Sequence, residues 1–199
     1  MKTALLVIDA QKIYTDKHSE LYCDDASRTI ANINQLTTKF EQFACPVVLV
    51  RHIHKADGSD LGRMFDFAGP SDEFNFKAGT KEVDYSEGLA RPADALEITK
   101  NRYSSFIGTE LDQTLKRLMV KRVVVCGFMT NFCCESAARD AHDLDYFVDF
   151  IPDATGTPGT SHMKQKEIRD VVSALLSEGF AEVFSTKDYL KHLPSRLEQ

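Results

Sequence analysis

The sequence lacks a long hydrophobic run. Its longest unbroken apolar stretch near the middle, at 123–129, falls far short of the about 20 apolar residues that a membrane-spanning helix needs. The N-terminal stretch is also apolar, but Asp9 ends it and no small-residue cleavage site follows, so it predicts a first strand and not a signal peptide. We therefore expect no membrane partner.

The sequence also has no excess of basic residues and no even set of cysteines. It carries 24 Lys and Arg against 30 Asp and Glu, for a formal net charge of −6. Without a basic stripe we expect no nucleic-acid partner. An odd number of cysteines cannot all pair within one chain, and two of them are adjacent, unlike a secreted disulfide framework. A cytoplasmic location is predicted. The cysteines are Cys23, Cys45, Cys126, Cys133 and Cys134.

What the sequence does have is an alternation of apolar runs and helical segments. Runs rich in Val, Ile and Leu are apolar on both faces, which is typical of parallel strands covered by helices. The segments between them have apolar residues three or four positions apart. We predict strands at about 3–9, 46–52, 95–100, 121–127, 146–151 and 181–185, and helices at about 25–43, 109–119, 131–143 and 162–178.

This alternation predicts the α/β class, as a three-layer, doubly wound parallel sheet of about six strands with helices on both faces. With 199 residues and 43% hydrophobic content, the chain suits a single domain over 1–199. Glycine, proline and aromatic residues at about 53–94 interrupt the alternation. Because loops of this length are usually functional, we expect an ordered excursion that acts as a lid or as an interface.

Polar residues end several of the predicted strands. Asp9, Arg51 with His52, Lys100 and the segment 127–130 stand at four such ends, although they are spread along the sequence. Ligands of doubly wound sheets bind beyond the carboxyl ends of the strands. We therefore expect these residues to meet at one site.

The segment 127–141 predicts a buried strand, a turn and the start of a helix, with Cys133 in the first helical turn. Unpaired backbone N–H groups and the helix dipole favour a thiolate there and could hold an oxyanion. Cysteine is also among the most buried residue types, so position alone leaves open whether Cys133 is a nucleophile or a small hydrophobe. Cys134 falls on an apolar helical stripe and is interpreted as a packing residue.

Three blocks in the sequence occur in a characteristic order. They read VIDAQ at 7–11, KNRYSSF at 100–106 and GFMTNFCCESAARDA at 127–141. These blocks resemble the V-I-D-x-Q start, the K-x-x-x-S-x-F stretch and the G-x-x-T-x-x-C block of the isochorismatase-like cysteine hydrolases, a family that includes nicotinamidases and N-carbamoylsarcosine amidase. Order and approximate spacing match over nearly the whole chain.

The resemblance implies a catalytic triad of Asp9, Lys100 and Cys133. It also implies an oxyanion hole from the backbone amides of Met129 and Cys133, and a cis peptide bond between Phe128 and Met129. The residue types suit this chemistry by themselves. The charge of Lys100 stabilises a thiolate, and Asp9 can take the thiol proton and return it to a leaving amine.

Further residues are predicted to bind the substrate. Gln11 and Tyr14 could line the mouth of the site, or they could lie in an exposed turn. Arg51 or His52 is suited to contact a substrate carboxylate or carbonyl. The predicted substrate-binding residues are Gln11, Tyr14, Arg51, His52, Phe106, Phe128 and Thr130.

The histidine content argues against a metal. Nicotinamidases of the family bind one through an Asp-x-His pair after the second strand and through further histidines. Here the pair reads His52-Ile53-His54, and no other histidine follows before His142. Zinc sites usually take three or four protein ligands, so we predict no metal and no cofactor, and we expect no metal-dependent nicotinamidase activity.

The leading hypothesis is a cysteine hydrolase that cleaves an amide-like C–N bond of a small carboxamide, ureido or carbamoyl compound through a thioacyl-enzyme. One alternative is isochorismatase, which cleaves a vinyl ether without a nucleophilic thiol. Another is a non-enzymatic thiol switch or ligand-binding scaffold that uses Cys133 and Cys134. The resemblance also implies a homo-oligomer, a dimer or larger, with a small-molecule substrate.

Overall fold

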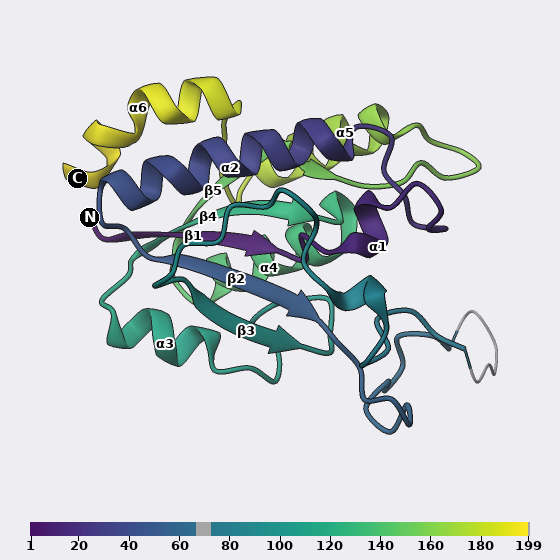
Figure 1. Cartoon of the computed structure of the whole chain (residues 1–199). Coiled ribbons are helices and arrows are strands. Elements are labelled where there is room, and N and C mark those ends of the chain that lie inside the picture. Colours follow the sequence, from purple (N-terminus) through teal and green to yellow (C-terminus); the bar gives the residue numbers. More distant parts are fainter. Residues whose placement is uncertain (67–72, 199) are drawn as a thin grey trace.

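The computed structural model describes residues 1–66 and 73–198, and a six-stranded sheet forms its centre (Figure 1). The strand order is β3-β2-β1-β4-β5-β6, and every neighbouring pair is parallel. The predicted doubly wound α/β sheet is thereby confirmed. The strands are β1 (Thr3–Ile8), β2 (Val47–His52), β3 (Leu96–Lys100), β4 (Arg122–Phe128), β5 (Phe147–Gly156) and β6 (Glu182–Val183).

Helices cover both faces of this sheet. One apolar core is shared with α3 (Leu111–Arg117), α4 (Glu135–Asp143) and α5 (Gln165–Ser177), and the other with α2 (Ala26–Gln42) and α6 (Thr186–Glu198). Helix α6 packs beside α2 along the sheet (Figure 1). Shorter elements are α1 (Lys12–Thr15), the 3₁₀ turn η1 (Lys81–Val83) and the π-helical turn η2 (Thr130–Cys134). None of the described helices is long and apolar enough to cross a membrane.

Helix α2 illustrates how the sequence pattern produces the packing. Its apolar residues Ile30, Ile33, Leu36 and Phe40 recur three or four positions apart, and all four are buried in the core between α2 and the sheet. Burying one such side chain contributes about 1.5–3 kcal/mol relative to leaving it exposed. This stripe therefore fixes which face of α2 meets the sheet.

Strand β5 and helix α6 are the longer elements that differ from the sequence prediction. Strand β5 continues past the predicted end at 151, because a shift in its register with β4 accommodates Pro152. Helix α6 is not predicted from the sequence, where Pro194 interrupts the helical pattern. A buried ion pair between Arg196 and Asp149 at 2.6 Å joins α6 to the sheet, and local propensity does not reveal this contact.

The excursion is described over 53–66 and 73–94, and its second part packs onto the body of the protein. Phe76 is buried in the same core as α2, and a single bridge pairs Tyr85 with Gln11 just past β1. Phe67 and the rest of 67–72 lie outside the described residues. A role of the excursion as a lid or as an interface stays a prediction.

Strands β1 and β4 lie side by side at the centre of the sheet, at the point where the strand order reverses. The connections leave such a switch point in opposite directions and open a crevice beyond the strand ends. Asp9 follows β1 and Met129 follows β4, while β2 and β3 end at His52 and Lys100. The predicted strand ends therefore meet at one edge of the sheet.

Candidate active site

Asp9 lies in a tight turn directly after β1, with φ at 48° and with its side chain fully buried. Gly127 on the neighbouring β4 has φ at 119°, and a side chain there would collide with the backbone of Ile8. Only glycine allows the two strands to approach in this way. The close approach brings the segment after β4 next to the Asp9 carboxylate.

Lys100 ends β3, and its buried ammonium group makes three contacts. The Nζ atom lies 2.8 Å from Asp9 Oδ2, 3.2 Å from Cys133 Sγ and 3.0 Å from the carbonyl oxygen of Arg102. An ammonium group has three N–H donors, so these contacts occupy all of them. Lys100 is thus held in one orientation between a carboxylate and a thiol.

Cys133 lies in η2, the helical turn that leads from β4 into α4, and only 2% of its surface is exposed. Burial raises the pKa of its thiol to about 12, although the charge of Lys100 acts in the opposite direction. From the sequence, the helix dipole predicts a thiolate at Cys133. The structure reverses that direction because desolvation of the thiolate outweighs the charge of Lys100.

The ionisation of Asp9 and Lys100 is set by their mutual contact. Burial raises the pKa of Asp9 above its ordinary value, although Lys100 lowers it. Burial alone would lower the pKa of Lys100, but the charges of Asp9 and Cys133 raise it overall. A carboxylate with a raised pKa beside a protonated thiol is suited to take that proton.

Tyr14 and Phe128 form one wall near the thiol. Their rings stack with centroids 5.1 Å apart, and both side chains are buried. The charges of Cys133 and Asp9 add to the effect of burial in raising the pKa of the Tyr14 hydroxyl well above its ordinary value, which places Tyr14 beside the triad. The peptide bond between Phe128 and Met129 is cis.

Thr130 continues the site just after this peptide bond. It is buried, and its hydroxyl lies 2.8 Å from the hydroxyl of Thr155 on β5. This contact ties the turn after β4 to the neighbouring strand. Tyr14, Phe128 and Thr130 are therefore predicted substrate-binding residues that the structure brings close to Cys133.

Gln11 has a different position from the one expected at the mouth of the site. It is fully buried, and its amide nitrogen donates hydrogen bonds to the carbonyl oxygens of His52 and Val83 at 3.1 and 3.0 Å. Its amide oxygen accepts a hydrogen bond from the backbone N–H of His52 at 2.8 Å. Gln11 thus joins the ends of β1 and β2 to the excursion.

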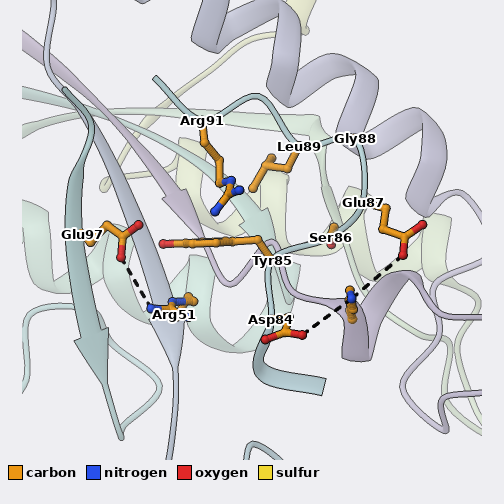
Figure 2. A pocket seen from close by; sticks show the side chains of 10 residues that line it. Arg51, Asp84, Tyr85, Ser86, Glu87, Gly88, Leu89, Arg91 and Glu97 are labelled. Atoms are coloured by element: carbon orange, nitrogen blue, oxygen red, sulfur yellow. Dashed lines mark hydrogen bonds and ion pairs between the residues drawn. The ribbon is translucent and has the colours of Figure 1, made fainter. Parts of the chain in front are cut away.

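Arg51 is not brought to the triad. Neighbours on a strand point to opposite faces, and Arg51 lines a separate cavity of about 450 Å³ (Figure 2). There its guanidinium lies 4.7 Å from the centre of the Tyr85 ring and 3.5 Å from the Glu97 carboxylate, while Arg91 covers the other side of the ring (Figure 2). The expectation that all strand-end residues meet at one site fails for Arg51.

Phe106 is buried in the same core cluster as Cys133. Its ring lies 6.0 Å from that of Tyr146, and it borders a cavity of about 370 Å³ near α3 and α4. A role of Phe106 in substrate binding stays a prediction.

His52 does reach the triad, and it brings residues that the sequence argument did not assign to the site. A ring nitrogen of His52 lies within 4.8 Å of both Cys133 Sγ and an Asp9 carboxylate oxygen. Phe76 stacks flat on the His52 ring at 4.3 Å, and His54 Nε2 lies 3.0 Å from His52 Nε2. The spacing of His52 and His54, two positions apart at a strand end, indicates that they share a face. Nothing in the local sequence indicates Phe76.

Asp9, His52 and Cys133 are also the groups that could hold a metal ion, since their ligand atoms lie within 4.8 Å of one another. The ammonium of Lys100 already contacts Asp9 and Cys133, and its positive charge would repel a divalent cation at the same place. These residues therefore do not fit a resident metal ion.

Comparison with known proteins indicates one family. The family model described as Isochorismatase domain matches residues 3–188. Nicotinamidase 3 of Arabidopsis thaliana is 31% identical over 180 residues, which cover 89% of this chain and 82% of that protein. The ureidoacrylate amidohydrolase RutB of Rhizobium rhizogenes is 37% identical over 197 residues, which cover 85% of this chain and 76% of that protein.

Solved structures show the same fold. A cysteine hydrolase from Pseudomonas syringae pv. phaseolicola superposes with a TM-score of 0.91 at 28% identity, and the match covers 98% of this chain and 93% of that one. The pyrazinamidase of Pyrococcus horikoshii in complex with zinc has a TM-score of 0.78 at 22% identity, and the match covers 93% of this chain and 99% of that one. At this identity the match supports the fold alone. The sequence blocks, the sheet and the family model agree, and the chain therefore belongs to the isochorismatase family and is a hydrolase.

Proposed function

We propose that this hydrolase is a cysteine amidohydrolase. It cleaves an amide-like C–N bond of a small carboxamide, ureido or carbamoyl compound through a thioacyl-enzyme intermediate. One observation carries the proposal, namely that a single buried ammonium, Lys100, contacts both the Asp9 carboxylate at 2.8 Å and the Cys133 sulfur at 3.2 Å. The similarity to a nicotinamidase and to ureidoacrylate amidohydrolases supports the same bond type.

The first half-reaction begins with proton transfer inside the triad. Asp9 takes the thiol proton of Cys133, and the sulfur attacks the substrate carbonyl carbon. The carbonyl oxygen gains negative charge and accepts hydrogen bonds from the backbone amides of Met129 and Cys133. When the C–N bond breaks, Asp9 returns its proton to the nitrogen, and ammonia or an amine leaves.

The second half-reaction releases the acyl group. Asp9 takes a proton from water, the oxygen attacks the thioester carbon, and the C–S bond breaks. The sulfur recovers the proton from Asp9, so the triad returns to its starting state. Lys100 contacts both members of the proton exchange, and the negative charge that moves between them stays beside the same cation throughout.

The two neighbouring cysteines offer a matched test. Cys133→Ala should abolish turnover on a panel of small carboxamides and ureides, while Cys134→Ala should keep it, because Cys134 is fully buried in the core with α4. Full turnover by Cys133→Ala would remove the basis of the proposal. Vinyl-ether cleavage retained in that variant would favour the isochorismatase alternative. A homo-oligomer and a cytoplasmic location stay predictions from the sequence.

A further inference from the structure

Three side chains form a chain of ring and carboxylate contacts that ends at the triad. Asp60 Oδ1 lies 3.4 Å from His54 Nδ1, and His54 Nε2 lies 3.0 Å from His52 Nε2. A His52 ring nitrogen is within 4.8 Å of Cys133 Sγ. Both histidines are buried, and burial lowers the pKa of each below its ordinary value. The two rings are therefore neutral, and each carries a single proton.

The position of the His54 proton follows from Asp60. The Asp60 carboxylate at 3.4 Å makes an electrostatic contact with His54 Nδ1 and not a close hydrogen bond, and its negative charge favours a proton on Nδ1 over a lone pair that faces it. His54 Nε2 is then an acceptor. Phe65 and Phe74 contact the His54 ring edge-on, which keeps the ring in place.

The position of the His52 proton follows in turn. Two ring nitrogens 3.0 Å apart need one proton between them, and since His54 Nε2 has none, His52 Nε2 donates. His52 Nδ1 is then unprotonated. It is buried, and no described residue gives it a hydrogen bond. Phe76, stacked at 4.3 Å, and Gln11, bonded to the His52 backbone, hold this residue in place.

A buried acceptor without a partner, on a ring that lies beside the nucleophile, selects for a donor. We propose that His52 Nδ1 positions the substrate by accepting a hydrogen bond from an N–H on the nitrogen next to the attacked carbonyl, which selects primary carboxamides and ureides. A carboxylate or an ester has no N–H at this place, so an oxygen lone pair would face the lone pair of His52 Nδ1. This inference rests on the proposed function, and it assigns His52 the opposite preference to the carboxylate contact expected from sequence.

The tautomers can be observed without any turnover. Long-range ¹H–¹⁵N spectra of the wild-type protein labelled with ¹⁵N-histidine should show the proton of His54 on Nδ1 and that of His52 on Nε2. His52→Asn and His54→Gln assign the two signals. The reverse tautomers overturn the inference even if the proposed function holds. One equivalent of Zn²⁺ should leave both Nε2 signals unchanged, and a shift of both would also overturn it.

Selectivity is tested with a primary carboxamide that the wild type hydrolyses and with the methyl ester of the same acid. His52→Leu should lower kcat/KM for the amide about 5- to 150-fold more than for the ester. His52→Asn, whose side-chain oxygen is an acceptor in place of Nδ1, should restore most of the difference. Equal losses on both substrates would indicate a merely structural residue and refute the inference.

Discussion

Replacing Lys100 by Met is predicted to inactivate the enzyme through Asp9, and not through the thiol directly. At an effective dielectric constant of about 20, the ammonium attracts the carboxylate at 2.8 Å by about 6 kcal/mol and a thiolate at 3.2 Å by about 5 kcal/mol. These values nearly cancel when the proton moves from Cys133 to Asp9. Lys100 therefore shifts that internal equilibrium little, while it strongly favours an ionised Asp9 over one protonated from solvent.

Without Lys100, burial alone acts on Asp9, and its pKa rises further. A larger share of Asp9 is then protonated at neutral pH, and that share cannot act as a base. We expect kcat/KM at neutral pH to fall about 10²- to 10⁴-fold, the usual contribution of general-base catalysis, and to recover partly as the pH is raised. The pH profile of kcat/KM measures this. Loss of one partner of a buried pair should also lower the free energy of unfolding by about 3–5 kcal/mol.

Lys116 offers a matched control. It pairs with Asp112 at the same 2.8 Å, but 61% of its side chain is exposed. Lys116→Met should change the free energy of unfolding by less than about 0.5 kcal/mol and leave the pH profile unchanged. An acidic limb in Lys100→Met at the same pH as in the wild type would contradict this prediction, because Asp9 would then be ionised without its partner.

The remaining predictions concern the thiol and the framework around it. The pKa of Cys133 is raised from 9.0 to about 12, so the unfolded chain loses the thiol proton first and the folded state loses stability as the pH rises above 9. Urea unfolding measures this. The difference in free energy of unfolding between the wild type and Cys133→Ala should narrow by about 1.4 kcal/mol from pH 7.5 to pH 10. Gly127→Ala should lower the free energy of unfolding by about 3 kcal/mol or more, since a side chain meets the backbone of Ile8, and a cost below 1 kcal/mol, by urea titration, would contradict this. Arg196→Met should lower the free energy of unfolding by about 3–5 kcal/mol in the same titration, because it leaves Asp149 buried with one partner fewer. Lys191 is exposed on the same helix, and Lys191→Met should change the free energy of unfolding very little.

The sheet and most of the helices could be predicted from the sequence because each depends on local pattern. Strands buried on both faces appear as continuous apolar runs, and α2 shows its period plainly. Helix α6 could not be predicted in this way. A proline interrupts its pattern, and its strongest anchor is an ion pair with β5 across many residues of sequence.

The site was predictable in part for the same reason. Asp9, Lys100 and Cys133 follow or end strands, and the topology of a parallel sheet brings such positions together. Arg51 and His52 are sequence neighbours, yet they point to opposite faces, so only His52 joins the triad. The ionisation of Cys133 could not be predicted, since its pKa depends on a degree of burial that helix position does not reveal.

In the proposed mechanism, Cys133 carries the acyl group during turnover. Acid quenching of the wild-type enzyme during hydrolysis of a primary carboxamide, followed by peptide mass spectrometry, measures this directly. We expect a mass increase equal to the acyl group on Cys133, absent in Cys133→Ala and retained in Cys134→Ala. Steady hydrolysis by the Cys133→Ala variant, with no acylated peptide in the wild type, would contradict it.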